Sequence, residues 1–223
     1  MGKGIEVCLA GLQGAGTLED ALEAEFVDCL VRQAGLVLVG EKPAALFGFR
    51  PRSHGAAPDA RAACLLSGRL LVAYAKRTKA YGVRIVWLAE REGGPMLLAW
   101  RPAQVAGLLD DEAARALMAS CGLPTAHAAR LVSDLVRRLR AYYAGRGPFP
   151  HEVGLILGYP VADVAGFMAD GGRGAVACGR WKVYGDPVRA RRRFDELGRH
   201  ERLCKRLYAE GVPMGELLRM GMA

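Results

Sequence analysis

The residues of this chain that are best suited to chemistry lie between positions 150 and 185. His151 and Glu152 follow Pro150, a residue that fits the first turn of a helix. A histidine can carry a proton or bind a metal near neutral pH, and a carboxylate at a helix N-terminus is favoured by the helix dipole. Because the HExxH pattern is absent, we expect no zinc-protease site. His151 and Glu152 are therefore catalytic candidates, with packing and capping as the alternatives.

Cys178 is the third catalytic candidate. It lies in a glycine-flanked stretch, GRGAVACGR, where we expect its sulfur to be more accessible than in the middle of a helix. Arg173 or Arg180 could favour its thiolate form, which is the reactive one. The alternative is an inert, structural cysteine.

Two further residues are candidates for binding an anionic ligand. Lys182 and Tyr184 alternate with Trp181 and Val183, so on a strand the first pair shares one face and the apolar pair is buried on the other. Lys42, in the segment EKPAALF, is a third candidate for contact with an anion. The alternative is that both lysines are ordinary exposed residues.

The cysteines and histidines do not form a metal-binding pattern. Six cysteines are scattered along the chain and none forms a CxxC pair, which argues against a zinc ribbon and a disulfide framework. His200 and Cys204 share a helix face, but two ligands do not make a metal site. We predict no metal site and a reducing, cytoplasmic location. No apolar run is long enough to cross a membrane.

The chain carries a net charge of +8, and its arginines concentrate at 130–146 and 189–206. We expect a partner-binding face at Arg189, Arg191, Arg192 and Arg193. Such a face can attract an acidic protein, an anionic ligand or nucleic acid. The alternative is a solvated helix face. A helix-turn-helix at 150–170 is disfavoured, since VADVAGFMAD offers no side chain suited to reading base edges.

The elements that must position these residues indicate a single α+β domain over residues 18–223, preceded by a segment 1–17 of uncertain order. We expect a small, mostly antiparallel sheet packed by helices and a helical C-terminal half. Strands are predicted at Leu70–Tyr74, Val83–Leu88, Met96–Trp100 and Ala175–Tyr184. Helices are predicted from Leu18 to Gln33, from an Asp110 cap to Gly122, and from a Thr125 cap to Tyr143 with an inner stripe of Ala128, Leu131, Leu135 and Leu139. Two short helices are predicted between Pro148 and Gly174, and a long helix from an Asp186 cap to Glu210 with an inner stripe of Ala190, Phe194, Leu197, Cys204 and Tyr208. A loop is predicted at 51–61.

Several blocks of this sequence resemble a known bacterial family. FPHEVGLILGYPVADVAGF, followed by CGRWKVYGD, is similar to the signature of domain of unknown function 3793, and GEKPAALFGF resembles an earlier block of that family. The resemblance covers residues 30–217. Other members often carry several cysteines before the WKVY block, whereas this chain has only Cys178 there, which puts a cysteine-bound metal in doubt. The family has no established activity, and its genes often lie beside those for flavodoxin and ferrous-iron uptake.

Three functional hypotheses follow from these observations. The first is a cytoplasmic accessory protein that binds a small ligand or metal-linked cofactor and docks an acidic redox partner, such as a flavodoxin, through its basic face. The second is an enzyme that uses His151, Glu152 and Lys182 on an anionic substrate. The third is a nucleic-acid-binding module. The identity of any cofactor is left open.

Overall fold

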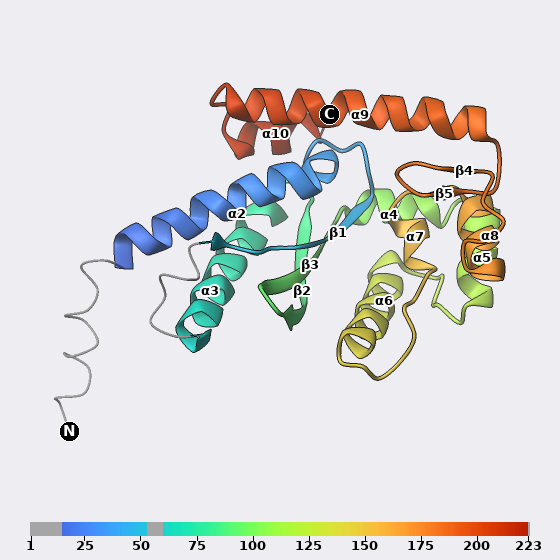
Figure 1. The fold of residues 1–223 in the computed structure, drawn as a ribbon, viewed down its shortest axis with the longest axis horizontal. Coiled ribbons are helices and arrows are strands. Elements are labelled where there is room, and N and C mark those ends of the chain that lie inside the picture. Colours follow the sequence, from blue (N-terminus) through green and yellow to red (C-terminus); the bar gives the residue numbers. More distant parts are fainter. Residues whose placement is uncertain (1–14, 53–59, 223) are drawn as a thin grey trace.

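The structure is a computed structural model that describes residues 15–52 and 60–222. The fold is α+β, as expected, with a small antiparallel sheet, a separate two-stranded hairpin and a helical C-terminal half (Figure 1). Most of the segment 1–17 and most of the loop expected at 51–61 lie outside the described residues. None of the described helices combines the length and apolar character that a membrane span requires.

The central sheet has three antiparallel strands in the order β1–β3–β2, where β1 is Ala44–Gly48, β2 is Arg84–Arg91 and β3 is Gly94–Trp100. Side chains on β3 alternate between its two faces. Leu97 and Ala99 therefore pack into one core, while Leu98 and Trp100 pack into another. The sheet thus separates two hydrophobic cores.

The strand predicted at Leu70–Tyr74 is wrong, because these residues belong to the helix α3 (Ala60–Lys79). Leu71 and Tyr74 are buried on one face of α3, whereas Val72 is exposed. A short apolar run is compatible with both helical and strand periods, and only its partners decide between them. The third strand of the sheet is instead β1, which comes from the ALFGF segment.

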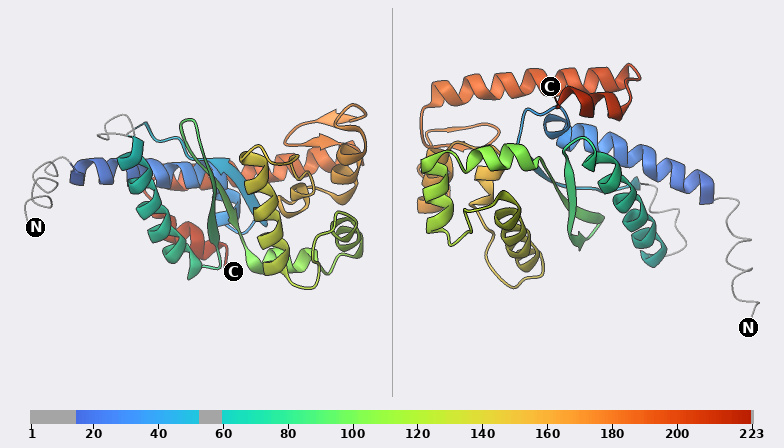
Figure 2. Two further views of the ribbon diagram at one scale, coloured as in Figure 1. Left: turned by 90° about the horizontal axis from the view of Figure 1, so that it is seen from below. Right: turned by 180° about the vertical axis from the view of Figure 1, so that it is seen from behind.

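The first core lies between the sheet, α3 and three more helices: α2 (Ala15–Leu38), α9 (Pro187–Ala209) and α10 (Met214–Met220). Figures 1 and 2 show α9 running along α2. The helix predicted to end at Gln33 continues through Gly35 to Leu38. A Cβ on Gly35 would lie 3.0 Å from Sγ of Cys204, so the glycine permits the close approach of α9. The helix then ends where the buried Arg101 donates hydrogen bonds to the carbonyls of Val37 and Leu38.

The second core is covered by a group of helices on the other side of the sheet: α4 (Pro102–Leu108), α5 (Glu112–Ser120), α6 (Ala128–Tyr143), α7 (Val153–Ile156) and α8 (Val161–Asp170). The expected inner stripe of α6 is confirmed at Leu131, Leu135 and Leu139, which are fully buried, while Ala128 at its start is partly buried. Two predicted caps are displaced along the chain. The cap of α5 is Asp111, not Asp110, and the cap position of α6 is His127, not Thr125.

The single strand predicted over Ala175–Tyr184 is wrong, because the chain reverses within it. It forms a hairpin of two short strands, β4 (Ala177–Cys178) and β5 (Lys182–Val183), with the turn closed by a hydrogen bond from Gly179 N to Trp181 O. The predicted alternation nevertheless holds on β5. Trp181 and Val183 are buried, whereas Lys182 is exposed and Tyr184 half-buried. As expected, Asp186 then caps α9.

Candidate functional site

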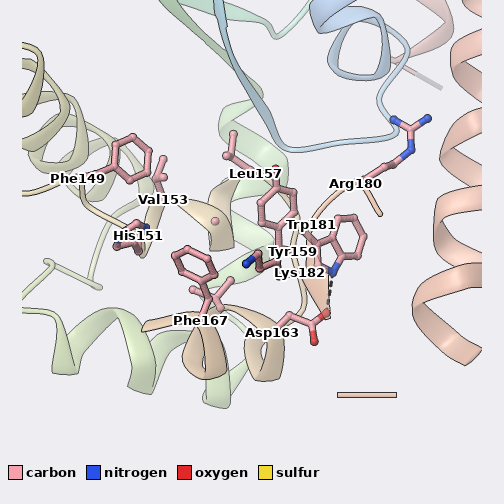
Figure 3. A pocket seen from close by; sticks show the side chains of 12 residues that line it. Phe149, His151, Val153, Leu157, Tyr159, Asp163, Phe167, Arg180, Trp181 and Lys182 are labelled. Carbon is pink, nitrogen blue, oxygen red and sulfur yellow. Dashed lines mark hydrogen bonds between the residues drawn. The ribbon is translucent and has the colours of Figure 1, made fainter. Parts of the chain in front are cut away.

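A cavity of about 280 Å³ lies between α7, α8 and the β4–β5 hairpin (Figure 3). Four aromatic rings line it, those of Phe149, Tyr159, Phe167 and Trp181. We call this space the aromatic cavity. Concave sites with mostly apolar walls and a few polar groups are typical of places where proteins bind small molecules.

The walls of the aromatic cavity hold one another in place. The rings of Tyr159 and Trp181 are stacked, with centroids 4.9 Å apart, and Phe194 of α9 packs edge-on against Trp181 at 4.5 Å. These contacts join α9, the β4–β5 hairpin and the turn before α8. The aromatic surface is therefore preorganised rather than assembled from mobile side chains.

Three basic side chains line the cavity: His151, Arg180 and Lys182. The exposed imidazole of His151 lies between two rings, 5.2 Å from that of Phe149 and 4.9 Å from that of Phe167. Arg180 is already paired with Glu201 at 2.6 Å. Lys182 instead donates a 2.8 Å hydrogen bond to the carbonyl of Gly172 and makes no ion pair within the described chain. Because an ammonium has three protons, Lys182 keeps donors for a ligand.

Asp163 supplies the carboxylate among the lining residues, and both of its oxygens accept hydrogen bonds from the protein itself. One oxygen accepts a 2.7 Å hydrogen bond from Trp181 Nε1, and the other accepts bonds from the backbone N–H groups of Tyr184 and Gly185. Asp163 is only 3% exposed. It therefore anchors the β4–β5 hairpin to α8, and the charge that the cavity presents to a ligand is positive.

Tyr184 does not line the aromatic cavity. Its hydroxyl donates a 2.5 Å hydrogen bond to Asp170, whose carboxylate also accepts the backbone N–H groups of Gly172 and Gly174. Desolvation, together with the bond to Asp170, raises the pKa of Tyr184 to about 12. The side chain thus holds the loop after α8 and positions Gly172, the partner of Lys182.

Glu152 and Cys178 also lie away from the aromatic cavity. Glu152 is buried and forms a 2.8 Å ion pair with Arg138, which also contacts Asp134 on the same helix. Cys178 is exposed on β4, as expected for a thiol in this turn. Of the three catalytic candidates, only His151 reaches the cavity that holds Lys182.

Lys42 lies in the turn between α2 and β1, near the aromatic cavity but not on its wall. Its ammonium is 5.4 Å from the centre of the Tyr159 ring, a distance typical of cation–π contacts. Burial, and after it the neighbouring charges of Arg180 and Arg193, lower the pKa of Lys42 to about 8. Lys42 is thus an unusually acidic lysine beside the aromatic wall.

The arginines at the start of α9 have different surroundings. Arg189, Arg191 and Arg192 are exposed, and none forms an ion pair with another described residue. Arg193 is half-buried, pairs with Glu196 at 2.6 Å and donates to the carbonyl of Glu41. The first three can reach a partner, whereas Arg193 joins α9 to the turn after α2.

Sequence reasoning missed Asp163 and the aromatic walls of the cavity. From the sequence, Phe167 is interpreted as a packing residue, Tyr159 as part of a helix break, and Asp163 as a favourable charge in the first turn of α8. The signal that could have identified them is their presence in the FPHE, LGYP and DVAGF blocks that carry the family resemblance, which the fold brings to one place. Within residues 15–52 and 60–222, no three His, Cys, Asp or Glu side chains gather in a way that could hold a metal ion.

The chain was compared with known protein families, curated proteins and solved structures. Residues 30–218 match the family described as Protein of unknown function (DUF3793). The matched range includes the aromatic cavity, Lys42 and all of α9. No curated protein and no solved structure matches the chain.

Proposed function

The chain belongs to the DUF3793 family of proteins of unknown function, and we propose that it binds a small, flat, anionic organic molecule in the aromatic cavity. The observation that carries this proposal is the combination of stacked aromatic walls with Lys182, a cation without a carboxylate partner in the described chain. Aromatic faces favour a flat apolar body, and an ammonium favours an anion. The small volume suits a compact ligand.

We further propose that the protein is an accessory factor of the cytoplasm. In this role it would dock an acidic redox protein, such as a flavodoxin, through α9. The support is the exposed set of Arg189, Arg191 and Arg192, which form no ion pair within the part of the chain that the structure describes. Complementary charge steers two proteins together and fixes their orientation. A second line of support is that Asp186, which begins α9, directly follows the hairpin of the aromatic cavity. A docked partner would therefore lie near the ligand.

The ligand-binding part is tested with anilinonaphthalene sulfonate, a fluorescent aromatic anion, as the probe. We expect Lys182→Met to weaken probe binding by about tenfold, since a hydrogen bond to a charged group is worth about 1.5–3 kcal/mol. The matched control is Lys76→Met, which removes the same charge from an exposed position on α3. Equal affinity of the two variants for the probe would refute the proposed role of Lys182.

The docking part is tested by binding to a purified flavodoxin at several salt concentrations. We expect Arg191→Glu/Arg192→Glu to weaken binding and to flatten its salt dependence, because both side chains are exposed charges. The control, Lys76→Glu/Lys79→Glu, makes the same change of charge on α3. If both double variants reduce binding equally, net charge alone is responsible and the docking face on α9 is wrong. Salt-steep binding to duplex DNA instead would support the nucleic-acid alternative.

A further inference from the structure

The size of the aromatic cavity limits what it can enclose. Its volume is about 280 Å³, and an apolar cavity of about 150 Å³ is large enough to hold one benzene molecule. Drug-sized and larger ligands occupy pockets of about 300–1,000 Å³. The aromatic cavity therefore suits a body of one or two rings, and it is too small to enclose a nucleotide with its base, sugar and phosphates.

The charge of the cavity limits the ligand to a single negative charge. Lys182 gives one proton to the carbonyl of Gly172 at 2.8 Å and forms no ion pair in the described chain, so two of its protons remain for a ligand. Arg180 is held at 2.6 Å by Glu201. Asp163 uses both of its oxygens on N–H groups of the protein. One available ammonium matches one carboxylate, whose oxygens can accept both of the remaining protons.

His151 supplies a second polar contact. Its imidazole is held between the rings of Phe149 and Phe167, whose centroids lie 5.2 Å and 4.9 Å away. Neither of its ring nitrogens forms a hydrogen bond with another residue that the structure describes. An imidazole carries at least one N–H, whether it is neutral or charged. His151 can therefore donate a hydrogen bond to an oxygen on the ring of a ligand.

We propose that the ligand of the aromatic cavity is an aromatic monocarboxylate of the hydroxybenzoate type. Its ring packs between Tyr159 and Phe167, where Figure 3 shows the nitrogen of Lys182. Its carboxylate accepts hydrogen bonds from Lys182, and its hydroxyl oxygen accepts one from His151. The inference rests on the proposed function and adds three features to it: the aromatic ring, the single carboxylate and the hydroxyl.

The test is isothermal titration calorimetry of the full chain with matched small molecules. Benzoate is compared with benzamide, which keeps the ring without the charge, and with cyclohexanecarboxylate, which keeps the charge without the aromatic ring. We expect benzamide to bind about tenfold more weakly, and cyclohexanecarboxylate roughly two- to tenfold more weakly. Benzoate that binds no better than either compound overturns the proposal.

The hydroxyl is tested with the three isomers of hydroxybenzoate. We expect one isomer to bind several-fold more tightly than benzoate, because its oxygen accepts a hydrogen bond from His151. His151→Phe keeps a ring between Phe149 and Phe167 but has no N–H, so this gain must disappear in that variant. A gain that persists in His151→Phe, or no gain with any isomer, overturns the assignment of the hydroxyl to His151.

Lys182→Met tests the contact with the carboxylate. In this variant we expect the preference for benzoate over benzamide to vanish, whereas the control Lys76→Met, changed at an exposed position on α3, retains it. A preference that survives in Lys182→Met shows that another group binds the carboxylate and overturns the proposed contact.

Failure of this inference can be distinguished from failure of the proposed function. If anilinonaphthalene sulfonate binds in a manner that depends on Lys182, but the benzoates neither bind nor displace it, the cavity takes an anion of another class and only this inference is wrong. If binding of the fluorescent probe does not depend on Lys182, the proposed function is wrong and this inference falls with it.

Discussion

The indole Nε1 of Trp181 donates a 2.7 Å hydrogen bond to the buried carboxylate of Asp163. This bond joins two sequence blocks that are 18 residues apart, the DVAGF block on α8 and the WKVYGD block on β5. The same carboxylate accepts the backbone N–H groups of Tyr184 and Gly185, so one side chain fixes the hairpin and one wall of the aromatic cavity.

Replacing Asp163 by alanine is expected to destabilise the protein by about 3 kcal/mol. The change leaves the buried Trp181 N–H and two backbone N–H groups without their acceptor, and an unsatisfied buried donor costs about 1–3 kcal/mol. Urea unfolding followed by circular dichroism measures the loss. Asp163→Asn, which keeps one carbonyl oxygen, serves as the graded control and is expected to lose less. A loss below about 1 kcal/mol in Asp163→Ala would show that the anchor is unimportant.

Gly166→Ala is expected to destabilise the protein by about 1–3 kcal/mol, although alanine favours helices more than glycine does. A Cβ on Gly166 would lie 2.4 Å from Cγ of Tyr184, so α8 and the chain after β5 would have to separate. The control is Gly107→Ala on α4, where a Cβ meets nothing within 4 Å. That variant is expected to be neutral or stabilised by up to about 1 kcal/mol. Thermal unfolding compares the two, and an equal effect would contradict the close approach.

Glu152→Ala is expected to cost about 2–3 kcal/mol of stability without changing the affinity for anilinonaphthalene sulfonate. The loss arises because Arg138, which is partly buried, keeps Asp134 but loses its 2.8 Å partner. Unfolding in urea and probe titration give the two readouts. A double-mutant cycle with Arg138→Met isolates the energy of the pair. A stable variant that no longer binds the probe would instead favour a direct role for Glu152 at the site.

Lys42→Met is expected to stabilise the protein by about 1–2 kcal/mol at pH 7. Folding lowers the pKa of Lys42 from 10.5 to about 8, so the unfolded chain binds more protons between these two pH values. The penalty for the charged form is therefore complete below about pH 8 and is relieved as the pH rises towards 10.5.

The measurement for this prediction is the difference in unfolding free energy between the original protein and Lys42→Met from pH 7 to pH 10.5. Taking the difference removes the contribution of other groups, such as the Cys29 thiol, whose pKa burial raises to about 11. We expect the advantage of Lys42→Met to shrink across this range. A difference that does not vary with pH would contradict the lowered pKa of Lys42.

Local sequence signals predicted the elements whose partners are close in the chain. The strands β2 and β3 are connected by a tight turn in which Gly93 and Gly94 have positive φ. Their pairing can therefore be predicted from a short stretch of the sequence. In the inner stripe of α9, Ala190, Leu197 and Cys204 are buried, and Phe194 and Tyr208 are partly buried. A helix of 23 residues has enough turns to show its period in the sequence.

Predictions failed where a distant segment decides the outcome. Leu70–Tyr74 lies in a helix because the edge of the sheet is occupied by β1, which lies more than 40 residues from its partner β3. The stretch Ala175–Tyr184 bends into a hairpin that Asp163 holds from α8. Such long-range contacts override local preference, since the chain gains more free energy from burial than from propensity.

The fold class, the main helices, the family and the selection of His151, Lys182 and Lys42 as candidate residues could all be predicted from the amino-acid sequence. Periodicity, caps and motif blocks are properties of short segments, so they can be recognised without knowing how those segments pack. Folding places His151 and Lys182 on the wall of one aromatic cavity, whereas Glu152 forms an ion pair with Arg138. It also places Lys42 over the ring of Tyr159. These contacts could not be predicted from the sequence, because contacts between distant segments depend on how those segments pack.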